Sequence, residues 1–260
     1  MPPFLVLGPL EVRTPDGMPA SLKRRKAREL LALLVLRSGT TVEREEIVDV
    51  LWGERPPVSA QANLNSYVWD LRRVLARAAP ADEPRPTTAR NGYRLDLRTE
   101  ECDAYLFEEL AATGRQALRN DRCRAAAELL AKALGLWRGR VLQGITAEFC
   151  VATAARLDLV RFEAMEDYAD ARLGLGQHEE LATELAATVR RHPLHERLWA
   201  QFMVALYRSG RRTDALRAYH DVCEVLNAEL GVGPCTQLRL LQQAIASRQC
   251  RHVRVGVRAS

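Results

Sequence analysis

Hydrogen-bonding and cationic side chains gather on one side of an expected helix between residues 63 and 79. Apolar residues recur there at spacings of three and four, which predicts one apolar stripe along a helix. That stripe consists of Leu64, Val68, Leu71, Val74 and Leu75. The polar residues of the segment are Asn63, Asn65, Ser66, Trp69, Asp70, Arg72, Arg73 and Arg77. Amide and guanidinium groups can form paired hydrogen bonds with base edges, and arginines also neutralise phosphates. The pattern therefore predicts a helix that can lie in the major groove of DNA.

For an isolated helix, a solvated basic surface would be the simpler interpretation. The segment that follows the helix favours DNA binding instead. Residues 87–97 read TTARNGYRLDL, where Asn91-Gly92 tolerates positive φ and Tyr93 and Leu95 alternate with Arg94. This pattern predicts a hairpin directly after the basic helix. A helix followed by a hairpin is the layout of a winged helix, whose wing contacts the DNA backbone or the minor groove. Arg90 and Asn91 are expected at the tip of the wing.

Length and composition indicate a globular protein of two domains, with 260 residues of which 47% are hydrophobic and 27% charged. A formal charge of +5 is compatible with a polyanionic partner. The six cysteines form no CxxC pair, which favours free thiols in a reducing cytosol and predicts no metal site. The N-terminus has no basic n-region and is interrupted by Gly8-Pro9, so we expect that it is not a signal peptide. No apolar run reaches the ~20 residues of a bilayer span, so we expect a soluble, cytoplasmic protein without a membrane partner.

The elements before the basic helix can be assigned from turn and helix signals. Residues 4–22 predict short strands of a small antiparallel sheet. A helix is expected to open within residues 23–28 and to run through Leu36. Its start carries a cluster of cations that opposes the helix dipole and suggests a nearby phosphate, although a solvated surface cluster is the alternative. The cations of that cluster are Lys23, Arg24, Arg25, Lys26 and Arg28.

A second helix is expected to begin at Thr41 or Val42, with Thr41 as a loose N-cap, and to end at Gly53. The connection through Pro56-Pro57 then leads to the basic helix, and the two helices form the helix-turn-helix.

From Cys102 onward the spacing is helical throughout. The helices expected there are 104–118, 123–137, 148–174, 179–191, 194–209 and 212–230. The pair within residues 205–222 partly matches tetratricopeptide repeats, whose two-helix units stack and commonly bind protein. The tail 248–260 is expected to be flexible.

An enzyme would need a site that the sequence does not offer. His192 and His195 lack an accompanying carboxylate motif, and Gly174-Leu-Gly176 follows a helix, so it is a helix stop and not a phosphate loop. We expect no catalytic residue and no cofactor. The alternative to DNA binding is a TPR-like interaction adaptor whose basic domain docks on acidic partners. Salt-dependent binding to duplex DNA would separate the two.

Several strings together resemble the antibiotic regulatory protein (SARP) family of bacterial transcriptional activators. They include LVLGPLEV, IVDVLWGERPP, LNSYVWDLRRVL and NGYRLDL in the first half, and ALGLWRG, HPLHERLWAQFMVALYRSGRRTDALRAYHDV and LNAELGVGP in the second. The resemblance implies a winged helix-turn-helix at residues 1–98 and an all-α, TPR-like bacterial transcriptional activation domain at 102–247, in a mainly α protein with a small β component. It also implies binding to direct repeats beside a promoter's −35 element, as a homodimer on DNA. Recruitment of RNA polymerase through its sigma factor and alpha subunit follows from it, commonly at an antibiotic gene cluster.

Carried over by position, the resemblance assigns three groups of residues. The base-reading helix contributes Asn63, Asn65, Ser66, Trp69, Asp70, Arg72 and Arg73. The phosphate and wing contacts come from Lys23, Arg24, Arg25, Lys26, Arg28, Arg77, Arg90, Asn91 and Arg94. The polymerase-facing loop comprises Gly53, Glu54, Arg55, Pro56, Pro57 and Val58. Trp69-Asp70 departs from the Ser-Arg that relatives favour, so Asp70 must either face a cytosine amino group or pair with a neighbouring arginine.

Overall fold

The computed structural model describes residues 2–78 and 85–247 and separates the chain into two compact units. The first unit comprises Met1–Ala112 and Lys132–Phe162, and the second comprises Thr113–Ala131 and Glu163–Ser260. The expected end of the basic helix at Ala79, the prolines Pro80 and Pro84, and the tail lie outside the described residues. The domain limits expected from the sequence stay a prediction.

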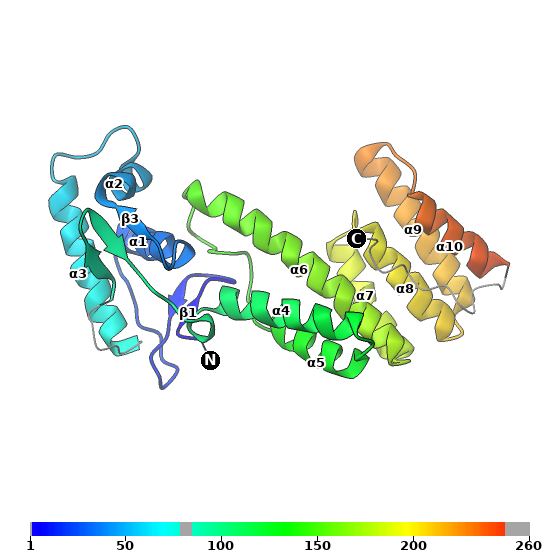
Figure 1. Cartoon of the computed structure of the whole chain (residues 1–260). Helices are drawn as coiled ribbons and strands as arrows, with labels where there is room; N and C mark the ends of the chain where they lie inside the picture. Colours follow the sequence, from blue (N-terminus) through cyan, green and yellow to red (C-terminus); the bar gives the residue numbers. More distant parts are fainter. Residues whose placement is uncertain (1, 79–84, 248–260) are drawn as a thin grey trace. The chain divides into compact units, whose positions relative to one another are not determined.

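Short strands and three helices make up the N-terminal part of the first unit (Figure 1). Strands β1 and β2 pair antiparallel, as the sequence predicts, and β3, β5 and β4 form a second antiparallel sheet in that order. The elements are β1 Phe4–Leu5, β2 Glu11–Val12, α1 Arg25–Leu36, β3 Thr41–Glu43, α2 Arg44–Trp52, α3 Ala60–Ala78, β4 Thr87–Ala89 and β5 Gly92–Arg94.

Two details of the second sheet correct the sequence-based expectation. Thr41 does not cap a helix, because Thr41–Glu43 is strand β3 and α2 begins at Arg44. Val42 is buried and lies opposite Tyr93 in the sheet, a long-range pairing that a local helix signal cannot reveal. Neither Asn91 nor Gly92 has a positive φ. Gly92 is needed for another reason, since a Cβ there would lie 2.0 Å from the carbonyl oxygen of Val42.

The helix-turn-helix consists of α2, the loop 53–59 and α3. Helix α2 ends at Gly53, whose φ of 64° suits a residue without a Cβ. Leu64, Leu71 and Leu75 are buried along one side of α3, which confirms the expected apolar stripe. Trp52 at the end of α2 stacks against Tyr67 of α3 with ring centroids 6.1 Å apart. Apolar burial and this ring contact hold the two helices together.

A buried carboxylate anchors the first strand segment. Asp103 is fully buried and accepts hydrogen bonds from the backbone N–H groups of Val6 at 2.7 Å and Leu7 at 3.1 Å. Burial raises the pKa of Asp103, while those two N–H groups and Arg138 act in the opposite direction. Arg138 also donates to Glu11 at 2.8 Å. The N-terminal strands are thereby tied to the start of helix α4 (Asp103–Arg119) and to the segment after helix α5 (Cys123–Leu134).

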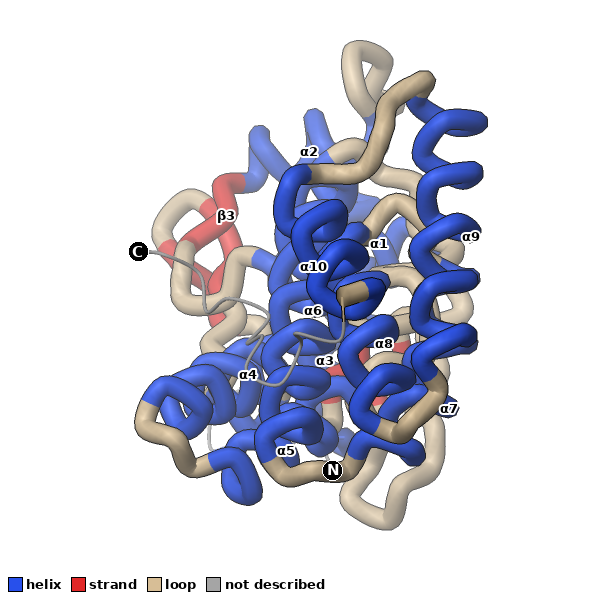
Figure 2. Tube along the Cα trace, turned by 90° about the vertical axis from the view of Figure 1, so that its right-hand side faces the viewer, coloured by secondary structure: helices blue, strands red, loops and turns tan. Residues whose placement is uncertain are grey.

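The remaining described part of the chain is helical apart from its turns (Figure 2). Its elements are η1 Thr99–Glu101, α4 Asp103–Arg119, α5 Cys123–Leu134, α6 Phe149–Gly174, α7 His178–Arg191, α8 Glu196–Arg208, α9 Arg212–Leu230 and α10 Thr236–Ala246. Six helices correspond to the expected ones with limits shifted by up to three residues. Helix α10 was not predicted, because it follows the Gly- and Pro-containing segment 231–234 that reads as a chain end. Among the described helices, none is long and apolar enough to cross a bilayer.

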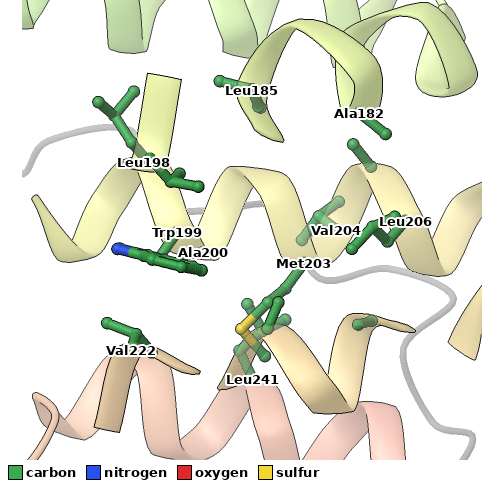
Figure 3. Packing of buried hydrophobic residues seen from close by; sticks show 14 of the residues in the cluster. Ala182, Leu185, Leu198, Trp199, Ala200, Met203, Val204, Leu206, Val222 and Leu241 are labelled. Atoms are coloured by element: carbon green, nitrogen blue, oxygen red, sulfur yellow. The ribbon is translucent and has the colours of Figure 1, made fainter. Parts of the chain in front are cut away.

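Helix α8 is central to the hydrophobic core of the second unit (Figure 3). Leu185 of α7 faces it from one side, and Val222 of α9 and Leu241 of α10 face it from the other. Met203 of α8 is fully buried between them. Stacked antiparallel helix pairs of this kind are the TPR-like arrangement that the sequence predicts.

Candidate nucleic-acid interface

The outer face of α3 presents a line of exposed polar and aromatic side chains. Asn65, Trp69, Arg73 and Arg77 follow one another at four-residue spacing and are all exposed, so they share one face of the helix. Trp69 is 59% exposed, and the Arg73 guanidinium lies 4.9 Å from the centroid of its ring. This cation–π contact holds the indole and the guanidinium together at the surface. We call these four residues the outer stripe.

Arg24 covers one flank of the outer stripe. Its guanidinium donates to the Ser66 hydroxyl at 2.8 Å and lies 3.6 Å from the Asp70 carboxylate. Asp70 therefore pairs with an arginine, the second of the two possibilities that the sequence left open, and that arginine comes from the residue before α1. Because Arg24 offsets the negative charge of Asp70, this carboxylate repels phosphate less than an unpaired one would.

Arg72 occupies the opposite flank and differs from the expectation of a base-reading guanidinium. Its Nε and Nη2 both donate to the carbonyl of Pro86 at 3.0 Å, and Nη2 also donates to the Thr88 hydroxyl at 2.7 Å. These partners precede and form β4, the first strand of the wing. These bonds engage three of the five N–H donors of the guanidinium, so Arg72 holds the wing against α3.

Asn65 is held by two residues that sequence reasoning did not select. Its side-chain carbonyl oxygen accepts one hydrogen bond from the Tyr93 hydroxyl and one from Arg44 Nη1, both at 3.0 Å. The Arg44 guanidinium lies 4.7 Å from the centroid of the Tyr93 ring. Tyr93 is part of the predicted hairpin pattern, but nothing in the local sequence connects it or Arg44 with Asn65.

The basic segment 23–28 is divided by the structure into two parts. Arg25 Nε and Lys26 Nζ each lie 2.8 Å from the carboxylate of Glu29, which is buried in α1. For these two cations the anion expected at the helix start is the protein's own Glu29. Arg28 is half-buried, whereas Lys23 and Arg24 precede the helix and are exposed.

The other expected contact residues lie around the same surface. Arg90 and Asn91 form the exposed turn between β4 and β5, as predicted. Arg94 pairs with Asp96 at 2.8 Å, and the Asn63 amide donates to the Ser59 hydroxyl at 3.1 Å near the start of α3.

The loop between α2 and α3 is exposed along its whole length from Gly53 to Ser59 (Figure 1). Pro56 and Pro57 fix their backbone φ angles, and Val58 presents a fully exposed apolar side chain. The exposed valine therefore follows directly on a backbone whose φ angles are fixed.

Other candidate sites have structural explanations. His195 occupies the N-cap position of α8 without a side-chain capping bond, its backbone N–H donates to the carbonyl of His192 at 3.2 Å, and the two rings meet edge to face. Among the described residues no cluster of three or more His, Cys, Asp or Glu could hold a metal ion. The five described cysteines are free thiols. Burial raises the pKa of Cys102 to about 12 and that of Cys150 to about 11.

A helix-turn-helix followed by a hairpin, with cations on the outer face of its second helix, defines a winged-helix DNA-binding protein. Residues 20–95 match the family model "Transcriptional regulatory protein, C terminal", and residues 102–246 match "Bacterial transcriptional activator domain". The chain belongs to the SARP family of bacterial transcriptional activators.

Relatives and a solved structure agree with this assignment. The regulatory protein DnrI of Streptomyces peucetius is 39% identical, over 92% of this chain and 90% of DnrI. The regulatory protein AfsR of Streptomyces griseus is 37% identical over 93% of this chain but only 24% of the longer AfsR. The structure of Mycobacterium tuberculosis EmbR in complex with a low-affinity phosphopeptide superposes with a TM-score of 0.89 and 33% identity. That superposition covers 97% of this chain and 66% of EmbR.

Proposed function

We propose that this protein activates transcription by inserting α3 into the major groove of promoter DNA. The outer stripe reads base edges through Asn65, Trp69 and Arg73. Lys23, Arg24 and Arg77 contact phosphates beside the groove, and the wing tip at Arg90 and Asn91 contacts the backbone next to it. Arg72 takes no part in base reading in this proposal, and instead fixes the angle between the wing and α3.

The observation that supports this proposal is the outer stripe itself, in which Asn65, Trp69, Arg73 and Arg77 are exposed on one helix face. Trp69 is 59% exposed, so its apolar ring surface is in contact with water, and covering that surface with a partner is favourable. The thymine methyl group offers such a contact in the major groove. Arg73 and Arg77, which follow the indole along the outer stripe, supply the attraction to phosphate.

We further propose that two copies bind head to tail on direct repeats near the −35 element. Neighbouring repeats would lie about one helical turn apart, ~10–11 base pairs, which places both copies on one side of the duplex. The loop 53–58 and the helical half of the chain then contact the sigma factor and the alpha subunit of RNA polymerase. Membership of the SARP family of antibiotic regulatory proteins supports control of a secondary-metabolite gene cluster.

Footprinting with the full chain tests the DNA-binding part. The probes are duplexes covering the intergenic regions beside the gene, and a non-promoter duplex of equal length is the control. We expect protected segments spaced by about one helical turn, with an affinity that falls steeply as salt rises. Equal, weak binding to all duplexes would refute sequence-specific recognition, and absence of duplex binding would leave the adaptor alternative.

Run-off transcription with purified polymerase tests recruitment. The variant Val58→Ser with Pro56→Ala and Pro57→Ala alters only the exposed loop, so we expect unchanged footprints and a loss of activated transcript. The matched control is Glu54→Ala in the same loop, which keeps the proline pair and the apolar side chain. Full activation by the triple variant would overturn the assigned role of the loop.

A further inference from the structure

The side-chain amide of Asn65 can act only as a hydrogen-bond donor toward DNA. A carbonyl oxygen has two lone pairs, and the Oδ1 atom of Asn65 already accepts from Tyr93 and from Arg44, each at 3.0 Å. The orientation of the amide is determined chemically, because a guanidinium has only donors and an NH2 group could not face Arg44. The exposed part of Asn65 is therefore its Nδ2 group.

Both partners of the oxygen are themselves fixed in place. Tyr93 is 3% exposed in the centre of the β3-β5-β4 sheet, where Val42 lies opposite it. Arg44 begins α2, its backbone N–H donates to the carbonyl of Asn91 at 2.9 Å, and its guanidinium packs against the Tyr93 ring. If Asn65 turned its oxygen outward, the hydrogen bonds from Tyr93 and Arg44 would break, and the Tyr93 hydroxyl would be left without an acceptor.

An asparagine that can only donate does not read adenine in the usual way. Paired recognition of adenine needs a donor for N7 and an acceptor for the N6 amino group. Guanine presents two acceptors, N7 and O6, on its major-groove edge, and cytosine presents only the N4 donor. The available Nδ2 group can donate two bonds to guanine, only one to adenine (N7) or to thymine (O4), and none to cytosine.

We infer that Asn65, set as a donor by Arg44 and Tyr93, selects guanine at one position of each recognition site and discriminates against adenine there. This inference rests on the proposed function, because it requires α3 to lie in the major groove. It assigns to Arg44 and Tyr93 a positioning role in base specificity, although neither touches the base. It also makes base choice at this position depend on the wing strand β5 and on the start of α2.

Selection from a duplex library with a randomised stretch of about 20 base pairs tests the inference with the full chain. The position that loses its base preference in Asn65→Ala identifies the base contacted by Asn65. For the wild-type chain we expect guanine there, about tenfold over adenine. Asn65→Ala should reduce that ratio to about one while preferences elsewhere in the site persist.

Asn65→Asp separates base reading from a merely structural role. An aspartate keeps an oxygen for Arg44 and Tyr93, so the wing stays in place, but its free atom is an acceptor. We expect the preference at this position to change from guanine to cytosine. Tyr93→Phe combined with Arg44→Ala removes both donors to Asn65 Oδ1, so the amide can turn its oxygen outward and we expect adenine to become tolerated there. Thermal unfolding of each variant is the folding control.

The outcomes are distinguishable from failure of the proposed function. If the wild-type chain enriches no sequence, the proposed function itself is refuted. If it enriches a site whose Asn65-dependent position is adenine, or if Asn65→Ala weakens every sequence equally, DNA binding stands and the donor assignment is overturned. Guanine at that position with a change to cytosine in Asn65→Asp confirms it.

Discussion

Arg72 provides a direct test of whether the wing is held by α3. Replacing Arg72 by Ala removes its hydrogen bonds to the Pro86 carbonyl and the Thr88 hydroxyl. A hydrogen bond from a charged group contributes about 1.5–3 kcal/mol when it is sheltered from water. Because Thr88 is exposed and Arg72 is only half-buried, screening by water reduces the sum to about 1–2 kcal/mol. The wing should therefore open more often, without loss of the helices.

Arg73→Ala is the matched control, since Arg73 is the next residue of α3 and has the same charge, but its guanidinium contacts the exposed Trp69 ring and not the wing. Hydrogen exchange followed by mass spectrometry on residues 85–97 measures the opening of the wing locally. We expect exchange to be about 5- to 30-fold faster in Arg72→Ala, the equivalent of 1–2 kcal/mol, and nearly unchanged in Arg73→Ala.

The two variants should also differ in DNA binding, because only Arg73 is proposed to contact a base. Arg72→Ala should weaken binding to all sites through its mobile wing and keep the selected sequence, whereas Arg73→Ala should also change base preference. Equal wing exchange in both variants, combined with an altered base preference in Arg72→Ala, would refute the reasoning. Arg72 would then leave Pro86 on binding and read a base, as the sequence alone suggested.

Three further outcomes follow from contacts outside the wing. Arg24→Ala should lower the slope of log affinity against log salt by about 0.9, the value for one lost phosphate contact, as measured by salt titration of duplex binding. Burial raises the pKa of Cys102 to about 12, so its thiol should resist iodoacetamide at pH 8 in the folded protein and react only on unfolding, while exposed Cys235 reacts first by mass spectrometry. Burial acts to raise the pKa of Glu101, but the hydrogen bonds from Arg85 and the Arg98 backbone outweigh it, and the net pKa is lowered below the ordinary 4.5. The stability that this ion pair contributes is therefore present at neutral pH and lost as the pH falls below about 4.5, and urea unfolding of Glu101→Gln should show a weaker acid dependence there.

The elements of the winged helix could be predicted because their signals are local. The apolar stripe with Leu64 and Leu71 repeats at helical spacing, and Tyr93 and Leu95 alternate at strand spacing, so each pattern is complete within one segment. Strand β3 was missed because its only cause is the partner strand. Val42 is part of a sheet only because it pairs with Tyr93, about fifty residues later in the sequence.

The chemistry of the interface was less predictable than its location. Residue type and spacing place Asn65, Asp70 and Arg72 on the polar side of a helix, but they do not tell which polar atoms are already used. Glu29 illustrates the same limit, since a glutamate within a basic helix start reads as one more surface charge. Only burial in the folded chain makes it the partner of Arg25 and Lys26.

The sequence of α3 alone therefore does not determine which groups its outer face presents to DNA. Arg24, which precedes α1, offsets the charge of Asp70. Arg44 of α2 and Tyr93 of β5 fix the amide of Asn65. The carbonyl of Pro86, just before the wing strand β4, accepts hydrogen bonds from Arg72. Each of these partners decides whether a side chain on α3 is presented as a donor, an acceptor or a neutralised charge. Two relatives with the same α3 sequence but a different residue at position 44 would then prefer different bases. Transplanting α3 by itself into another winged helix should carry over affinity for phosphate, because charge travels with the helix, but not the choice of base at the Asn65 position.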